Sequence, residues 1–178
     1  MGFETIFATI AMVVIIGFTS YFVITGALFS IDTLSDSLKA ASKIDNERLK
    51  TEIEIVHVSL SGVEQNKPNI NVIVNNTGHT SIREFEHMDV IVYYCSPGGP
   101  GGTPQIQWIP YTTENPPGNN EWTVTSISPD FINPGIFNPD ESMTLWIKVA
   151  PPIWNLSERN WLQITTPNGV SDSKYFST

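Results

Sequence analysis

Residues 6–31 read IFATIAMVVIIGFTSYFVITGALFSI, and no charged residue lies between Glu4 and Asp32. About 20 apolar residues in a helix cross the roughly 30 Å hydrocarbon core of a bilayer, so this run is long enough to span a membrane. A cleavable secretory signal has a basic segment before a shorter apolar run, and here no Lys or Arg precedes the run. A helix buried in a soluble core rarely stays uncharged for this length. The stretch therefore predicts a membrane anchor that remains part of the protein.

The predicted anchor residues are the large apolar side chains of this run. They are Ile6, Ile10, Val13, Val14, Ile15, Ile16, Phe18, Phe22, Val23, Ile24, Leu28 and Phe29.

The helical pattern continues beyond the apolar run. Apolar residues recur at three- and four-residue steps, namely at Ile31, Leu34, Leu38, Ala41 and Ile44. Charged residues fill many of the positions between them, and the first proline is Pro68. One helix over about residues 3–50 would be about 70 Å long at 1.5 Å per residue. It would cross the membrane and continue as an amphipathic stalk, whose apolar stripe needs a partner.

After residue 50 the period changes to that of β-strands. Short runs rich in β-branched and aromatic residues alternate with turn signals, and they predict strands at 51–60, 69–75, 88–95, 105–109, 121–127, 142–149, 161–165 and 169–176. A phase slip near Val56 predicts a β-bulge. Seven or eight such strands favour an all-β antiparallel sandwich, immunoglobulin-like in outline, preceded by one long N-terminal membrane-spanning α-helix. The predicted domains are 1–50 and 51–178.

Composition limits the partners that the β-domain can have. The chain of 178 residues has 9 Lys and Arg against 18 Asp and Glu, a formal net charge of −9. Nucleic acid is therefore excluded as a partner, because phosphate binding needs a basic surface. The single cysteine, Cys95, rules out an internal disulfide framework, and we interpret it as a small buried hydrophobic residue. We interpret the five tryptophans as mostly core residues.

No enzyme motif is present in the sequence. The three histidines, His57, His79 and His87, are scattered and do not form an H-E-x-x-H pair, and the sequence contains neither a G-x-S-x-G elbow nor a dinucleotide fingerprint. The glycine-rich segment 96–104 lacks the Lys-Ser/Thr ending of a P-loop, and a flexible hairpin tip explains it better. We therefore expect neither catalysis nor a cofactor.

An acidic run at residues 84–89 allows two interpretations. If the run were a strand, Glu84, Glu86 and Met88 would share one face, and the two carboxylates could hold a divalent ion. A solvated acidic edge is the simpler interpretation, and we expect no metal. His57 is similarly expected to be a solvent-facing strand residue.

Two N-x-S/T sequons begin at Asn75 and Asn155, and either could carry a glycan if the domain lies outside the cell. The positive-inside rule points the other way, because Lys39 and Lys43 follow the apolar run while Glu4 alone precedes it. The acidic β-domain and the sequons favour a single-pass cell-membrane protein with its C-terminal domain outside the cytoplasm.

The chain resembles the archaeal flagellin-like family of archaellin and type IV pilin-like proteins, in which an N-terminal hydrophobic helix leads directly into a β-sandwich. The residues that carry the resemblance are the opening 1–31 and the stretch 72–82, VIVNNTGHTSI, which is similar to the V-x-V-x-N-T-G-x-T motif of that family. From Tyr94 onward the resemblance is one of fold type alone.

Within this family, two roles compete. Gly2-Phe3 is similar to the junction at which filament subunits lose a basic leader, yet only Met1 precedes it here. The resemblance is therefore closer to the uncleaved, membrane-anchored archaellum accessory proteins of the FlaF or FlaG kind. It implies a stator whose domain binds the surface-layer protein or other archaellum components, with membrane lipid around its helix, as a homo- or hetero-oligomer. The alternative is a filament-forming archaellin or type IV pilin-like subunit.

Overall fold

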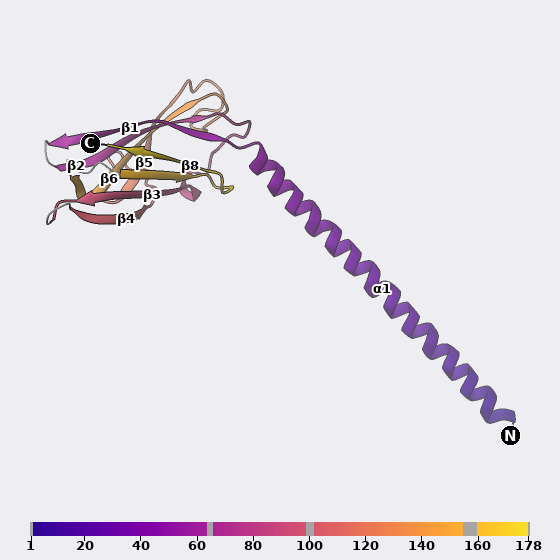
Figure 1. The fold of residues 1–178 in the computed structure, drawn as a ribbon. Helices are drawn as coiled ribbons and strands as arrows, with labels where there is room; N and C mark the ends of the chain where they lie inside the picture. The colour runs from indigo at the N-terminus through magenta and orange to yellow at the C-terminus, as the bar shows by residue number, and fades with distance from the viewer. Residues whose placement is uncertain (1, 64–65, 99–101, 155–159, 178) are drawn as a thin grey trace. The chain divides into compact units, whose positions relative to one another are not determined.

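The computed structural model of the protein describes residues 2–63, 66–98, 102–154 and 160–177. The chain divides into two compact units, Met1–Asp45 and Asn46–Thr178. The first is helical, and the second contains the last turn of the same helix and all the strands (Figure 1).

The helix α1 (Gly2–Leu49) is a single element of 48 residues, which confirms the prediction of one helix through the apolar run and the charged stretch after it. Its hydroxyl side chains donate to carbonyl oxygens four residues earlier, as in Thr9 Oγ1 to Thr5 O at 2.7 Å and Thr25 Oγ1 to Tyr21 O at 2.9 Å. These bonds satisfy the hydroxyl donors within the helix, so that they need no water. The Ser and Thr residues are therefore compatible with an apolar environment.

The second unit contains eight strands. They are β1 (Ile53–Val63), β2 (Asn66–Asn76), β3 (Asp89–Ser96), β4 (Thr103–Ile109), β5 (Glu121–Ser128), β6 (Ser142–Trp154), β7 (Asn160–Thr165) and β8 (Ser171–Phe176). Two four-stranded antiparallel sheets form, in the orders β1-β2-β6-β5 and β4-β3-β7-β8. This is the immunoglobulin-like sandwich expected from the sequence. Compared with the seven-stranded form, β4 is an additional strand at the edge beside β3.

The eight predicted strands are all present, and β2 and β6 are longer than predicted. In the acidic run, a 3₁₀ helix, η1 (Phe85–His87), stands where the divalent-ion interpretation required a strand. The prediction that Glu84, Glu86 and Met88 share one strand face is therefore wrong. Met88 is buried in the core, whereas both glutamates are exposed.

The core lies between the two sheets and is filled by alternate residues of their strands. Among its largest fully buried side chains are Trp122, Tyr94 and Phe137. Burial raises the pKa of Tyr94 to about 12, and its hydroxyl donates to Pro151 O at 2.9 Å. The interpretation of the tryptophans as mostly core is wrong, because of the five only Trp122 is fully buried and Trp108 is 59% exposed. Cys95 is also only half-buried.

The sandwich is closed along one side, where the edge strands β1 and β8 meet. The β1–β2 register shifts between Ile55 and His57, which confirms the predicted bulge. Ile55 N donates to Asp172 Oδ2 at 2.6 Å, and Lys174 Nζ donates to Ile55 O and Val56 O at 2.9 and 2.8 Å. Two β8 side chains thus occupy main-chain groups that the edge would otherwise leave unpaired.

Candidate functional site

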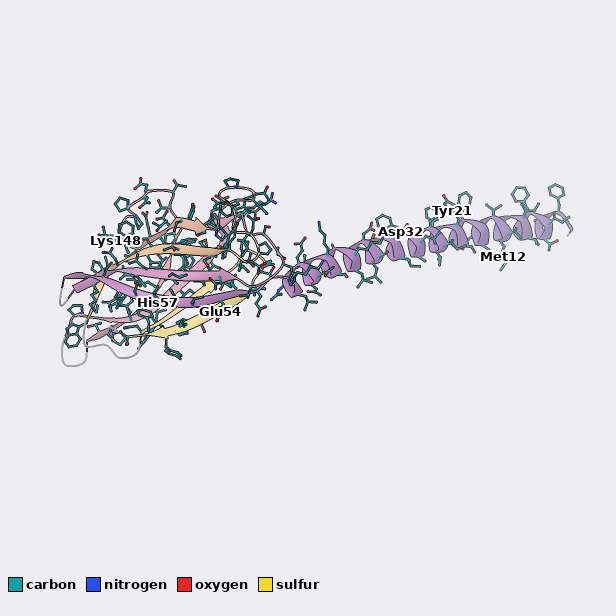
Figure 2. All side chains as sticks on the ribbon, turned by 90° about the horizontal axis from the view of Figure 1, so that it is seen from above. Met12, Tyr21, Asp32, Glu54, His57 and Lys148 are labelled. Carbon is teal, nitrogen blue, oxygen red and sulfur yellow. The ribbon has the colours of Figure 1, made fainter. Side chains whose placement is uncertain are left out.

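The predicted anchor residues all lie on α1, where each is exposed. This helix is long and apolar enough to cross a membrane. Figure 2 shows side chains such as Met12 and Tyr21 projecting from the apolar part, and Asp32 at the start of the charged part. The contact of these residues with lipid remains a prediction.

The last turn of α1 and the start of the sandwich form the candidate site, which we call the junction: residues 47–52, 76–80 and 166–170. Thr51 closes the helix, since its N–H donates to Arg48 O at 3.1 Å and its Oγ1 donates to Glu47 O at 2.8 Å. Both bonds satisfy carbonyls that the end of the helix leaves without a partner. The chain then enters β1 at Ile53.

The motif that carried the family resemblance builds one side of the junction. Asn76 is 1% exposed. Its Nδ2 donates to Thr80 O at 2.9 Å and to Phe137 O at 3.1 Å, and its Oδ1 accepts from Gly78 N at 3.2 Å. An asparagine supplies donors and an acceptor in one short side chain, and here all are used. The side chain therefore fixes the shape of the turn that follows β2.

The turn after β2 also binds the segment between the helix and β1. Thr77 N and Gly78 N both donate to Glu52 O, at 3.1 and 3.0 Å, and His79 N donates to Lys50 O at 2.7 Å. A Cβ on Gly78 would lie 2.7 Å from Lys50 O and would also overlap the backbone nitrogen of Glu52. The glycine of the motif is needed because the two backbones touch at this point.

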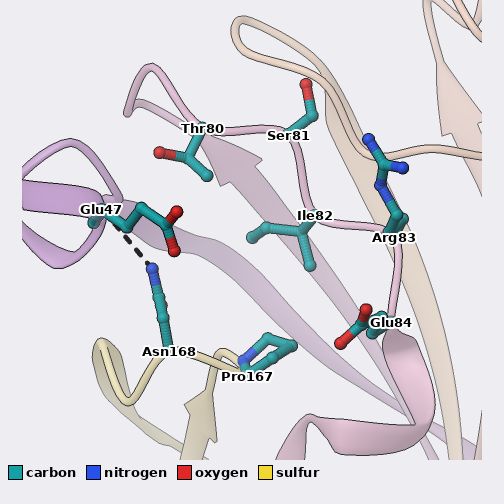
Figure 3. Close-up of a pocket in the computed structure, with 8 residues that line it drawn as sticks. All are labelled: Glu47, Thr80, Ser81, Ile82, Arg83, Glu84, Pro167 and Asn168. Carbon is teal, nitrogen blue, oxygen red and sulfur yellow. Dashed lines mark hydrogen bonds between the residues drawn. The ribbon is translucent and has the colours of Figure 1, made fainter. Parts of the chain in front are cut away.

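A second turn contacts the junction from the other sheet. Asn168 Nδ2 donates to Thr51 Oγ1 at 2.6 Å and to Glu47 O at 3.5 Å, and its Oδ1 accepts from Thr166 Oγ1 at 2.6 Å. Figure 3 shows the bond between Asn168 and Glu47, at the side of a shallow pocket that Arg83 and Glu84 also line. The arrangement is a mechanical attachment of the helix end to both sheets.

The remaining predicted site residues lie apart from the junction or at its edge. Asn75 is half-buried on the outer face of β2, and its Oδ1 accepts from Ser142 Oγ at 2.7 Å. Asn155 lies outside the described residues. His57 is exposed, as predicted (Figure 2). Across the described residues, no three His, Cys, Asp or Glu side chains are grouped in a way that could hold a metal ion.

The sequence patterns do not bring the turns at residues 75–78 and 167–169 together. The turn residues themselves were visible, since Asn and Gly are typical of such positions. Their shared contact with residues 50–52 depends on the topology, which puts the end of β2 and the β7–β8 turn beside the start of β1.

Comparison with known proteins agrees with the resemblance seen in the sequence. A model of the archaeal-type flagellin family matches residues 1–176. An uncharacterized protein of Archaeoglobus fulgidus is 32% identical over 181 residues, which cover 99% of this chain and 97% of that protein.

Two solved structures are also similar. The archaeal flagellum of Methanospirillum hungatei superposes with a TM-score of 0.54 at 14% identity, covering 99% of this chain and 93% of that chain. The archaellum periplasmic stator protein FlaG from Sulfolobus acidocaldarius gives a TM-score of 0.49 at 25% identity, covering 71% of this chain and 99% of that chain.

The first of these structures shares the fold along nearly the full length of this chain. The family match and the Archaeoglobus relative extend over almost every residue of the sequence. From these matches, the chain is a member of the archaeal-type flagellin family.

Proposed function

We propose that the chain is a membrane-anchored, stator-type component of the archaellum motor. The apolar part of α1 crosses the cell membrane once, and the sandwich lies outside the cytoplasm. There it binds the surface layer or a partner subunit and holds the motor static. Flagellins are structural proteins, so membership in their family supports a structural function over an enzymatic one.

The observation that carries the proposal is the division of α1 into an apolar and a charged part. Seven charged residues of α1 lie from Asp32 to Arg48, and none lies between Glu4 and Asp32. A filament core that surrounds the whole helix with other helices would bury these charges, at a cost of several kcal/mol for each one left unpaired. An anchor buries the apolar part in lipid and leaves the charged part in water, where it costs nothing.

The junction supports the same function. A static attachment must pass force from the helix to the sandwich, and the turns after β2 and β7 bind the segment that connects them. A domain on a flexible linker would not need Gly78 or the buried side chain of Asn76. Asn75 remains a proposed glycosylation site, for which removal of glycans followed by mass spectrometry of its peptide is the test.

Cell fractionation tests the proposal. Filaments are sheared from cells that express the full chain, and the chain is quantified by mass spectrometry in the filament and membrane fractions. We expect it in the membrane fraction, and we expect chemical cross-linking of intact cells to join it to a surface-layer protein. Recovery of the chain in filaments, in amounts comparable with the main subunit, would overturn the proposal.

A pair of matched variants tests the anchor itself. Val14→Lys places a charge in the middle of the apolar part, where a lysine costs about 3 kcal/mol, so membrane retention should fall. Leu34→Lys places the same charge in the charged part and should leave retention unchanged. Lower retention of Leu34→Lys than of Val14→Lys would contradict a membrane-spanning apolar part.

The second candidate function, a filament subunit, is favoured by a different observation. The fold matches the subunit of a flagellar filament over nearly the whole chain, helix included. That role would place the apolar part among copies of itself instead of in lipid. The same fractionation distinguishes the two.

A further inference from the structure

The two outer faces of the sandwich have different chemistry. The outer face of the sheet β1-β2-β6-β5 is mainly polar. Its side chains include His57, Ser59, Asn71, Asn75, Thr144 and Lys148, with Ile73 and Trp146 half-buried among them. Figure 2 labels two of these, His57 and Lys148. Such a face is well solvated and offers little apolar area to a partner.

The outer face of the sheet β4-β3-β7-β8 is apolar. Residues paired across the strands form one apolar row, Ile106–Tyr93–Trp161–Tyr175. The neighbouring row is half apolar and half polar, Trp108–Ile91–Gln163–Ser173. The residues next to them along the strands, such as Val92 and Leu162, are fully buried in the core. Because neighbouring strand residues point to opposite faces, the two rows face outward. Ile106 is 73% exposed and Tyr175 is 77% exposed. We call the two rows the aromatic face.

This face carries almost no charge, although the chain as a whole has a net charge of −9. Among the described strand residues that point outward here, Asp89 is the one charged residue, and its Oδ1 accepts a hydrogen bond from Trp108 Nε1 at 2.9 Å. The charged residues of β8, Asp172 and Lys174, point to the other side and contact β1. Tyr and Trp in a setting of low charge are the residues that dominate protein–protein interfaces.

We propose that the aromatic face binds the same face of a second copy of this chain. Two copies repel each other over most of their acidic surface, and this neutral face is where they can meet without that repulsion. A two-fold axis parallel to the strands keeps the strands of both copies in the same direction and sets the row against its own copy in reverse, with Ile106 opposite Tyr175. A basic partner would find no acidic groups here, apart from the carboxylate that Trp108 already occupies.

The area of the face sets the strength of the pairing. Four strands spaced about 4.8 Å apart, with about six residues each rising about 3.3 Å, cover roughly 400 Å². Two such faces together bury roughly 800 Å², at the lower end of weak or transient interfaces. Pairing is therefore expected to be weak between free domains and effective between copies held in one membrane, where the local concentration is high. The assignment of the face does not depend on what the sandwich binds in the archaellum.

Cross-linking in vesicles tests the proposal with the full chain. In a Cys95→Ser background, Ser173→Cys places a single thiol on the aromatic face, and Ser126→Cys places one at an exposed serine of the other sheet. Each protein is reconstituted in phosphatidylcholine vesicles and treated with a flexible bismaleimide long enough to cross the face. We expect a covalent dimer from Ser173→Cys and at least about tenfold less dimer from Ser126→Cys.

Charge substitutions then test which residues make the contact. Ile106→Asp with Tyr175→Asp puts like charges on both sides of a two-fold interface and should lower the dimer yield at least about tenfold. Both residues are exposed, so the fold should be retained. Phe131→Asp, at a side chain 88% exposed in a loop, is the matched control and should leave the yield unchanged.

Each contrary result has a distinct meaning. A Ser173→Cys protein that is labelled by a monofunctional maleimide but forms no dimer overturns the proposal. A dimer that survives the double aspartate variant shows contact through another surface, such as the helix, and also overturns it. Flotation of the vesicles separately reports anchoring, so a failed anchor is distinguished from a failed interface.

Discussion

Gly78→Ala is the substitution whose effect on stability the structure predicts most specifically. The new methyl group would meet Lys50 O at 2.7 Å and the backbone nitrogen of Glu52 closer still. Both contacts are with backbone, so no side chain can rotate away to make room. Either the turn after β2 or the start of β1 must move, and the hydrogen bonds from Gly78 N and His79 N lengthen as it does.

The expected cost follows from overpacking and from these bonds. Inserting a methyl group into a tightly packed site costs about 1–3 kcal/mol, and weakening two backbone hydrogen bonds adds about 1 kcal/mol. A loss of about 3 kcal/mol in the free energy of unfolding corresponds to a fall of roughly 10 °C in Tm for a unit of this size. The same change should loosen the attachment of the helix end.

The assay is thermal unfolding of the full chain in detergent, followed by the fluorescence and near-UV dichroism of its tryptophans. Gly17→Ala is the matched control, because a Cβ there meets nothing within 4 Å, and its Tm should equal that of the wild type or exceed it slightly. Amide exchange at Thr77, Gly78 and His79 should also become faster in Gly78→Ala. A Tm within about 2 °C of the wild-type value would refute the close approach on which the reasoning depends.

Three further predictions concern other contacts of the sandwich. Asn76→Ala should lower the free energy of unfolding by about 3 kcal/mol, measured by urea denaturation, and Asn76→Asp should cost as much because it retains size but loses the donating amide. Lys174→Met should cost about 1 kcal/mol and accelerate amide exchange at the β1 bulge, whereas equal exchange rates would contradict the role of Lys174 there. Tyr94→Phe should cost about 1 kcal/mol at pH 7. Because the pKa of Tyr94 is raised from 10.0 to about 12 in the folded protein, its contribution is fully present below pH 10 and is lost as the pH rises towards 12, so the variant should lose less stability than wild type over that window.

Local patterns were sufficient to predict most of the fold. The period of the apolar residues gave the long helix and all eight strands, because a membrane run and half-buried strands are each defined by nearby residues. The bulge at Val56 was visible as a slip in that period. The failures occurred where tertiary context decided the outcome, as at residues 84–89, where a 3₁₀ turn directly precedes the buried Met88.

The candidate site was harder to predict than the fold. Asn76 and Gly78 lie in a recognisable motif, yet Gly78 bonds to Glu52 and Asn76 bonds to Phe137, and no local pattern links such distant segments. The tryptophans show the same difficulty: Trp122 faces the core and Trp108 faces solvent, although both lie in strands with apolar residues. Only the pairing of strands tells which side is the core.

The placement of β1 has a mechanical consequence. The chain enters the sandwich at Thr51, at the end where β1 begins, and β8 starts beside it, with Asp172 and Lys174 bonded to Ile55 (Figure 1). Tension between the helix and a load gripped at the far end therefore acts along the strands. The ladder between β1 and β2 is then sheared, so that its hydrogen bonds share the force instead of opening one after another, and the attachments from Asp172 and Lys174 resist the same sliding.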